Sequence, residues 1–341
     1  MASCMSMVGS LLWAGAQYKA VVELAQYLDV PKPVVEPTVF IGLLTWTLVG
    51  GLVADVLFDS MSMVAVAPCV CAVGLAAVAS TPTSAFSVEF KHATTALPTQ
   101  RAANTLCVGL LGNLFTEELA GRILLAQSPQ EARTACLLSS CLFGVVGLAP
   151  AALGIWARSA SGLLVNEDGG SLCDQDNGQD QVLSVALQGL MPSWLQGYHK
   201  ALFVLLVVES LNTVDTSILM LAQVMRSQAH RIIPKWHDAP WLTKAAAFVS
   251  LLLVVGVSRL GDNVWELGEA AVAAVGAPLT VICVFLHRQV GGQDRRAMTA
   301  AMLVAQLVYI VQSRSGDEAG MPFVWAVSWG CAAYGVACHL T

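Results

Sequence analysis

The sequence predicts an all-α membrane protein with about ten transmembrane helices. Of its 341 residues, 56% are hydrophobic and only 12% are charged, whereas about 25% of residues are charged in soluble domains. Apolar runs of about 17–25 residues, the length that crosses a bilayer, recur along the chain. The predicted helices lie at residues 5–27, 36–57, 60–80, 105–125, 134–157, 200–226, 242–258, 264–286, 297–312 and 322–339.

Positive charge in three connections sets the predicted topology. Lys and Arg residues gather at 226–244, at 287–296 and near 126–133, which all fall on one side of the predicted alternation. Cytoplasmic loops carry an excess of these residues. The acidic stretch 166–180 falls on the opposite side. We therefore expect a multi-pass protein of the plasma membrane with both termini in the cytoplasm.

Composition and spacing also exclude several classes of function. No basic cluster of the kind that binds nucleic acid is present. Cys69-Val70-Cys71 has no His or carboxylate at zinc-ligand spacing, and most other cysteines lie within apolar runs. No Ser/His/Asp set or HExxH motif stands at catalytic spacing. We expect neither an enzyme nor a bound cofactor other than an ion.

The sixth predicted helix, at 200–226, carries polar side chains in its middle. Glu209, Asn212, Thr213 and Thr216 fall within an arc of roughly 100° on one face, and Gln223 extends the same stripe. Because a carboxylate that faces lipid costs several kcal/mol, this face should look into protein or a water-filled path. Its oxygens suit a small hard cation, as in half of a sodium site. The alternative is that these residues satisfy one another between packed helices.

The fourth predicted helix, at 105–125, is interrupted. Gly109, Gly112 and Asn113 weaken its middle, and charged residues follow from Glu117. A broken helix at membrane depth is tolerated beside a cavity, and such breaks mark binding sites in transporters. The alternative is an ordinary span that ends near Thr116.

Four short motifs stand in order along the chain. They are Thr45-Trp46-Thr47-Leu48-Val49-Gly50-Gly51-Leu52 followed by Asp59; Gly121-Arg122-Ile123-Leu124 with Ser128 and Glu131-Ala132-Arg133; Met191-Pro192-Ser193-Trp194-Leu195; and Asn212-Thr213-Val214-Asp215-Thr216-Ser217-Ile218-Leu219. Together they resemble the motifs of the sodium:solute symporter family, most closely those of the high-affinity choline transporters. The segment from Asp262 to Phe285 resembles the family's eleventh span. The matching spacings extend over most of the chain.

The resemblance implies a LeuT-like inverted repeat of five plus five helices with flanking spans, in a single transmembrane domain at 1–341. By this correspondence, residues 5–80 are the remainder of the first repeat and residues 105–286 are the second repeat. Residues 297–339 are two flanking helices. The family's first two core helices have no counterpart here, so we expect an N-terminally incomplete version of the fold.

The resemblance also implies the activity. We expect a sodium-coupled symporter that moves a small, choline-like organic solute across the bilayer by alternating access. The family's second sodium site maps onto Glu209, Asn212 and Thr213, and Glu209 stands where a small residue is usual, which leaves proton coupling open. Asp59 matches an Asp near the family's sodium exit. Its place close to a predicted helix start is also typical of an N-cap, the interpretation that we favour.

A choline-like solute would need aromatic walls. Quaternary ammonium ions are held in aromatic cages by cation–π attraction. By the resemblance, Trp13 lines the solute pocket, and Asn113, Phe115 and Thr116 lie at the break in the fourth helix. Thr116 replaces a Trp of the family, so other small organic solutes remain open. Trp13 is equally compatible with a packing residue or an interfacial anchor.

A second function is compatible with the sequence. A relative that lacks two core helices can serve as a non-transporting regulatory or assembly subunit in the membrane. Solute uptake that stays flat with and without sodium would favour this second function.

Overall fold

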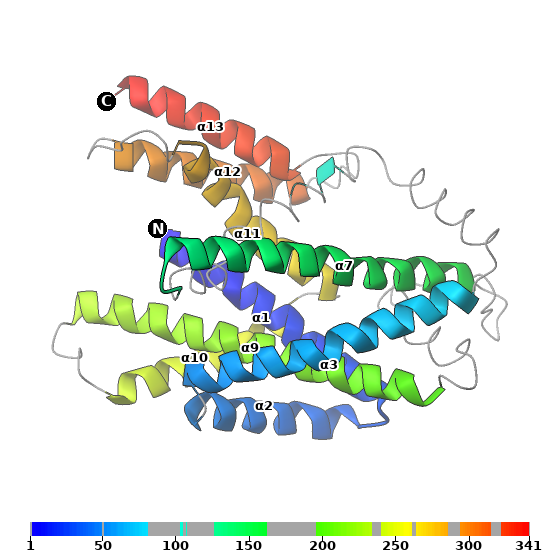
Figure 1. The fold of residues 1–341 in the computed structure, drawn as a ribbon. Helices are drawn as coiled ribbons and strands as arrows, with labels where there is room; N and C mark the ends of the chain where they lie inside the picture. The colour runs from blue at the N-terminus through cyan, green and yellow to red at the C-terminus, as the bar shows by residue number, and fades with distance from the viewer. Residues whose placement is uncertain are drawn as a thin grey trace. The chain divides into compact units, whose positions relative to one another are not determined.

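All the regular structure that can be described is helical. The computed structural model describes residues 2–49, 51–80, 103–104, 107, 126–161, 196–233, 240–260, 264–285, 294–314 and 322–340, and every regular element among them is an α-helix. The helices of Figure 1 are α1 (Ala2–Tyr27), α2 (Lys32–Val49), α3 (Gly51–Ser80), α7 (Pro129–Ser161), α9 (Gln196–Ile232), α10 (Pro240–Ser258), α11 (Val264–Phe285), α12 (Asp294–Arg314) and α13 (Pro322–Leu340). The all-α prediction is confirmed for these residues. The predicted fourth helix lies almost wholly outside them.

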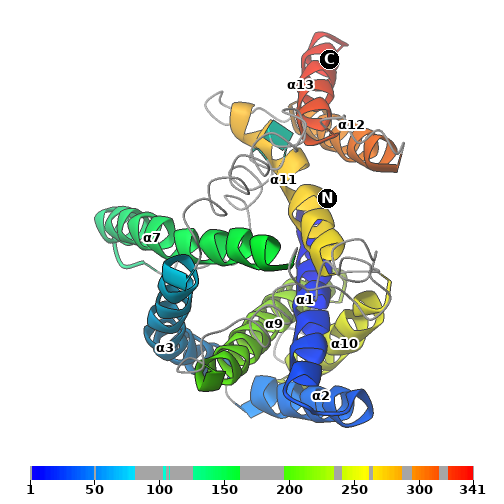
Figure 2. The same cartoon turned by 90° about the vertical axis from the view of Figure 1, so that its right-hand side faces the viewer.

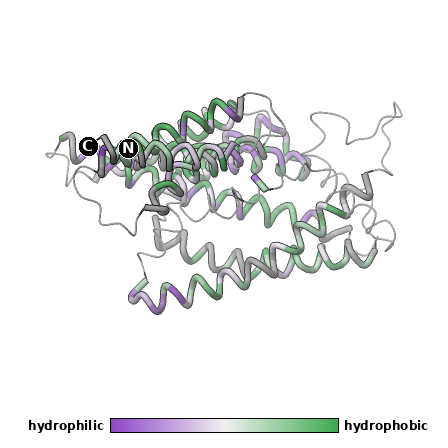
Figure 3. Tube along the Cα trace, turned by 90° about the horizontal axis from the view of Figure 1, so that it is seen from above, coloured by the Kyte–Doolittle hydropathy of each residue, from purple (hydrophilic) through white to green (hydrophobic). Residues whose placement is uncertain are grey.

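Two of these helices contain segments that are long and apolar enough to cross a membrane. They are Lys200–His230 within α9 and Trp241–Ser258 within α10. Four shorter apolar segments accompany them in the described residues: Val64–Ala76, Gly147–Trp156, Leu267–Pro278 and Arg296–Gln312. Figure 3 shows hydrophobic residues along much of the described helices. Length and composition therefore make two of the ten predicted spans candidate membrane spans, and all ten stay predictions.

The division between α2 and α3 differs from the prediction. The sequence predicts helices at 36–57 and 60–80, but α2 ends at Val49 and α3 begins at Gly51. The division lies next to Gly51, and glycine has a low helix propensity because it loses more backbone entropy on folding than any other residue. Asp59, which lies close to the predicted helix start at residue 60, is inside α3 instead.

A tight turn joins α1 to α2. The amide of Val30 donates to the carbonyl of Ala25 at 3.2 Å, and the amide of Asp29 donates to that of Gln26 at 3.0 Å. This is the Schellman pattern, which places one residue in the left-handed region. Asp29 occupies that position with φ of 65°, which Asp tolerates better than most side chains. Pro31 follows, so the predicted end of the first helix at residue 27 is confirmed.

Ser128 and Glu131, two residues of the motif that begins at Gly121, lie at the start of α7. Ser128 Oγ accepts the amide of Glu131 at 3.1 Å, and Glu131 Oε2 accepts the amide of Gln127 at 2.9 Å. Ser followed three residues later by Glu is the signature of a helix N-terminus, where each side chain satisfies an amide that the helix leaves over. Ser128 and Glu131 therefore have a structural role at the first turn of α7.

The packing divides the chain into two compact units. The first contains the described residues of Met1–Ala16, Leu97–Leu125 and Met220–Thr341, and the second contains those of Gln17–Ala96 and Ala126–Leu219. Both boundaries inside helices fall within α1 and α9, so these two helices contribute to both units. The predicted ranges 5–80, 105–286 and 297–339 describe an internal repeat and its flanking helices. A division by packing does not test a repeat, so these ranges stay predictions.

In the second unit, α3 packs against α7 (Figures 1 and 2). A Cβ atom at Gly74 of α3 would lie 3.0 Å from the Cβ of Ala149 in α7, so the two backbones approach closely there. Large apolar side chains from α3, α7 and α9 form the adjoining core. Its buried members are Val66, Val70, Val73, Leu153, Trp156, Leu202 and Phe203.

In the first unit, α12 and α13 pack side by side (Figures 1 and 2). Ala297, Ala301 and Ala305 of α12 are fully buried at one-turn intervals. A Cβ atom at Gly330 of α13 would lie 2.9 Å from the Cβ of Ala305. Small residues let two helix backbones approach closely, as in membrane helix bundles. Asn104 Oδ1 accepts the amide of Phe323 at 2.9 Å and so caps the first turn of α13.

Candidate functional site

The middle of α9 is polar and buried. Asn212, Asp215, Thr216 and Ser217 are all at most 3% exposed, although they lie within an otherwise apolar segment of membrane-spanning length. The flanking residues Leu202, Phe203, Leu221 and Ala222 are also buried. In the middle of α9, polar and apolar side chains are therefore both buried against other parts of the protein. The prediction that polar residues of this segment face protein is confirmed for Asn212 and Thr216.

Two threonines of this segment bond to their own helix. Thr213 Oγ1 donates to the carbonyl of Glu209 at 3.0 Å, and Thr216 Oγ1 donates to the carbonyl of Asn212 at 3.1 Å. Such bonds use the hydroxyl hydrogen, as is usual for Thr within helices. A hydroxyl oxygen keeps two lone pairs with which it can accept a hydrogen bond or bind a cation. Both threonines therefore have the chemistry of cation ligands.

A hydrogen bond joins this segment to α2. Thr47 Oγ1 donates to Asp215 Oδ1, and both residues are buried in the second unit. A buried carboxylate is strongly destabilising unless hydrogen bonds or opposite charges compensate it. Thr47 supplies one such bond across 168 residues of sequence separation. Two of the four motifs, those containing Thr47 and Asp215, therefore meet in space.

Asp215 was missed as a site residue by the sequence analysis. Its direction on the helix lies about 60° outside the arc of Glu209, Asn212, Thr213 and Thr216, so the helical pattern does not select it. What could have indicated Asp215 is its residue type and not its position on the helix face. An acidic residue in an apolar span needs a hydrogen-bond donor on a neighbouring helix.

The predicted sodium ligands lie on successive turns of α9 in the second unit. Asn212 is buried, whereas Glu209 and Thr213 are partly exposed. Gln223, which continues the predicted stripe, is exposed. The structure thus brings Glu209, Asn212 and Thr213 onto one stretch of helix, but it does not extend the buried stripe to Gln223.

Asp59 is not an N-cap. It lies eight residues after the start of α3 at Gly51, in the helix interior. An N-cap precedes the first helical residue and has non-helical backbone angles, so the N-cap interpretation is wrong. The orientation of the Asp59 side chain lies outside the described residues, and its proposed role beside the sodium path stays a prediction.

Trp13, the predicted solute-pocket residue on α1, packs against a glycine. A Cβ atom at Gly268 of α11 would lie 3.6 Å from Cζ3 of Trp13, which is partly buried. This contact within the first unit supports the packing alternative for Trp13. The other three predicted pocket residues, Asn113, Phe115 and Thr116, lie outside the described residues.

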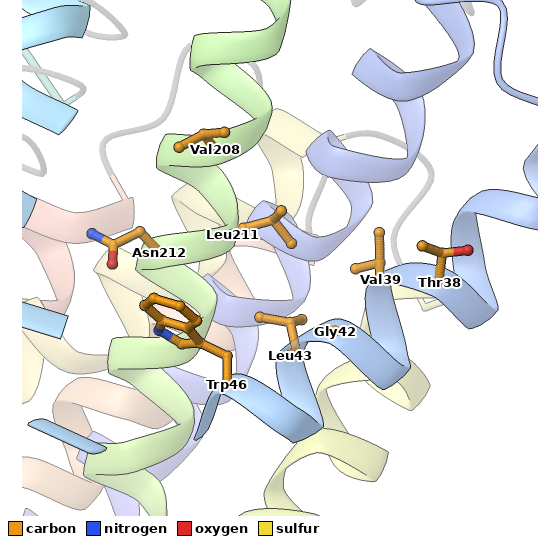
Figure 4. Close-up of a pocket in the computed structure, with 8 residues that line it drawn as sticks. All are labelled: Thr38, Val39, Gly42, Leu43, Trp46, Val208, Leu211 and Asn212. Carbon is orange, nitrogen blue, oxygen red and sulfur yellow. The ribbon is translucent and has the colours of Figure 1, made fainter. Parts of the chain in front are cut away.

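A cavity of about 340 Å³ lies between α2 and α9, within the second unit. It is lined by Thr38, Val39, Gly42, Leu43 and Trp46 of α2 and by Val208, Leu211 and Asn212 of α9. Figure 4 shows that Trp46 reaches from α2 toward α9 and lies near Asn212. The predicted sodium ligand Asn212 therefore also forms part of a cavity wall.

Among the described residues, no group of three or more His, Cys, Asp or Glu side chains could hold a metal ion. Such groups are typical of zinc sites, whereas a small hard cation also takes hydroxyl, amide and carbonyl oxygens, of which α9 offers several. No protein-family model matches the chain, and no curated protein matches it.

Proposed function

We propose that the protein is a sodium-coupled secondary transporter for a small organic solute. The observation that carries the proposal is the buried carboxylate of Asp215, bonded to Thr47, inside a helix of membrane-spanning length. Ionisable residues inside membrane helices are costly to keep, and they commonly mark ion and substrate pathways.

Exposed hydroxyls support the membrane location of the other helices. Thr38 and Thr45 of α2 donate to the carbonyls of Val34 and Ile41, and Ser140 of α7 donates to that of Cys136. Each of these side chains is exposed and its hydroxyl bonds to its own helix, which is compatible with a surface that faces lipid. Large apolar side chains share these surfaces, with Val49 of α2 82% exposed. We therefore propose that these helices also span the bilayer, in a ten-span inverted-repeat arrangement.

The cation would be held by oxygens of α9. Asn212 offers its amide oxygen and Thr213 its hydroxyl, and Glu209 offers either its main-chain or its side-chain oxygen. The negative charge of Asp215, one turn further on, makes a positive guest favourable in a region of low dielectric constant. Sodium fits this set of ligands, and no His or Cys ligand is needed.

Coupling would follow from the bond between Thr47 and Asp215. A cation close to α9 draws the Asp215 carboxylate and competes with the Thr47 hydroxyl for it. The contact between α2 and α9 then differs between the sodium-bound and sodium-free states, which is the two-state element that alternating access requires. Reciprocity demands that solute binding tighten sodium binding by the same factor.

Uptake into proteoliposomes tests the proposal. The purified chain is reconstituted in lipids without choline headgroups, and radiolabelled choline uptake is compared under inward sodium and inward potassium gradients. Sodium should drive accumulation, and Thr213→Ala should raise the sodium concentration needed for half-maximal uptake. Thr45→Ala, which removes an exposed hydroxyl of α2, is the matched control. Equal uptake under both gradients would overturn sodium coupling.

A further inference from the structure

The cavity between α2 and α9 has nearly apolar walls. Its aliphatic walls come from Val39 and Leu43 of α2 and from Val208 and Leu211 of α9. Thr38 contributes a hydroxyl that already donates to the carbonyl of Val34 at 2.7 Å. The other polar side chains of the lining are Asn212, which is 3% exposed, and Trp46, and they lie near each other in Figure 4.

The lining selects for an uncharged guest. None of the eight residues that form the cavity is charged. A strongly hydrated ion would lose its hydration without gaining an opposite charge from these eight side chains, which is strongly unfavourable. A quaternary ammonium ion over Trp46 is the alternative that competition with choline tests. One amide can exchange hydrogen bonds with a hydroxyl, because it has both donor and acceptor groups. A volume of about 340 Å³ lies within the range of small-molecule sites.

The approach to the cavity is apolar. Ile41 and Trp46 of α2 are 62% and 42% exposed. The neighbouring hydroxyl of Thr45 donates to the Ile41 carbonyl rather than outward. A guest that is dissolved in the hydrocarbon region of a bilayer can therefore reach the cavity without crossing a polar surface.

We propose that this cavity binds a neutral, hydroxyl-bearing lipid that enters from the bilayer. Its apolar chain lies along Val39, Leu43 and Leu211, its hydroxyl meets the Asn212 amide, and the indole of Trp46 covers it. The site does not depend on transport activity, but it rests on the proposed position of α2 in the bilayer. Because Asn212 also belongs to the proposed sodium site, lipid and cation would influence each other's binding.

Gly42 provides a way to close the site. A Cβ atom at Gly42 would meet no other atom within 4 Å, because the position faces the cavity. Leu is a better helix former than Gly, so Gly42→Leu fills the cavity without weakening α2. Gly154 of α7 is also open within 4 Å, and Gly154→Leu is the matched control. Val39→Phe closes the same cavity by a second route.

Photolabelling tests the proposal. The full chain is placed in nanodiscs of phosphatidylethanolamine and phosphatidylglycerol and irradiated with a long-chain alcohol that carries a diazirine. We expect labelled peptides from residues 38–46 and 208–212. Labelling there should fall about tenfold in Gly42→Leu and in Val39→Phe, a factor that corresponds to ~1.4 kcal/mol of binding free energy. Gly154→Leu should label like the unchanged protein.

Two results would overturn the proposal. The first is labelling spread evenly over the exposed helices, or labelling of the cavity peptides that Gly42→Leu and Val39→Phe leave unchanged. The second is loss of labelling in excess choline chloride, which would assign the cavity to a cationic solute held over Trp46. Neither result depends on sodium-driven uptake, so this test and the uptake assay fail separately.

Discussion

The contact between α2 and α9 differs in kind from the contact between α12 and α13. In the second unit, α2 and α9 are joined by the Thr47–Asp215 hydrogen bond and leave a cavity beside it. In the first unit, α12 and α13 meet through alanines and Gly330, so closely that a single added carbon would clash. The contact between α12 and α13 is close-packed. The contact between α2 and α9 keeps a buried carboxyl group and a cavity, which both cost stability, and we attribute this cost to the proposed binding of a guest.

The largest expected effect comes from breaking the close-packed contact. Gly330→Leu should destabilise the protein by about 1–3 kcal/mol, because the new Cβ would lie 2.7 Å from Val281 Cγ2 and 3.1 Å from the Ala301 carbonyl oxygen. Thermal unfolding of the purified chain in detergent measures the loss. Gly256→Leu in α10, where a Cβ meets nothing within 4 Å, is the control. Equal loss in both variants would show that α12 and α13 do not pack as described.

The next effect comes from removing the bond between α2 and α9. Thr47→Ala should cost about 1–3 kcal/mol, because it deprives the buried Asp215 carboxylate of a donor. Thr47→Ser should restore most of the stability, since it keeps the hydroxyl. Thr45→Ala should change stability by less than about 0.5 kcal/mol, because the Thr45 hydroxyl is exposed and bonds within its own helix. Denaturant unfolding of the three variants gives the ranking, and a loss in Thr45→Ala as large as that in Thr47→Ala would remove the special role of Asp215.

The smallest stability effect has the opposite sign. Gly42→Leu should stabilise the protein by about 0.5–1 kcal/mol, because Leu is the better helix former and its side chain has room in the cavity. The same change from Gly to Leu therefore stabilises at residue 42 and destabilises at residue 330. Parallel melting curves of the two variants measure this difference directly. A destabilised Gly42→Leu variant would mean that the cavity is smaller than 340 Å³ in solution.

Much of the helix plan can be predicted from the sequence. The predicted ranges 242–258, 264–286 and 322–339 agree closely with α10, α11 and α13, because Pro or charged residues bound those apolar runs. The predicted boundary at 57–60 is wrong, because α3 begins at Gly51 and continues through Asp55 and Asp59. The low helix propensity of glycine agrees with the observed position of the boundary.

The site is only partly predictable, for a different reason. Helical periodicity indicates which residues of α9 share a face, and it selected Asn212 and Thr216 correctly. It contains no information about which helix packs opposite, so the pairing of Thr47 with Asp215 could not be derived. The exposure of Gln223 likewise depends on tertiary packing at that end of α9, which periodicity does not specify.

Sodium-dependent stability of the purified full chain tests most directly whether the polar turns of α9 bind a cation. Unfolding is followed in detergent while NaCl replaces KCl at constant ionic strength. Sodium at ten times its dissociation constant should add ~1.4 kcal/mol, and the gain should disappear in Thr213→Ala and Asp215→Asn but persist in Thr45→Ala. Identical curves in the two salts, or an equal sodium effect in all variants, would contradict a sodium site on α9.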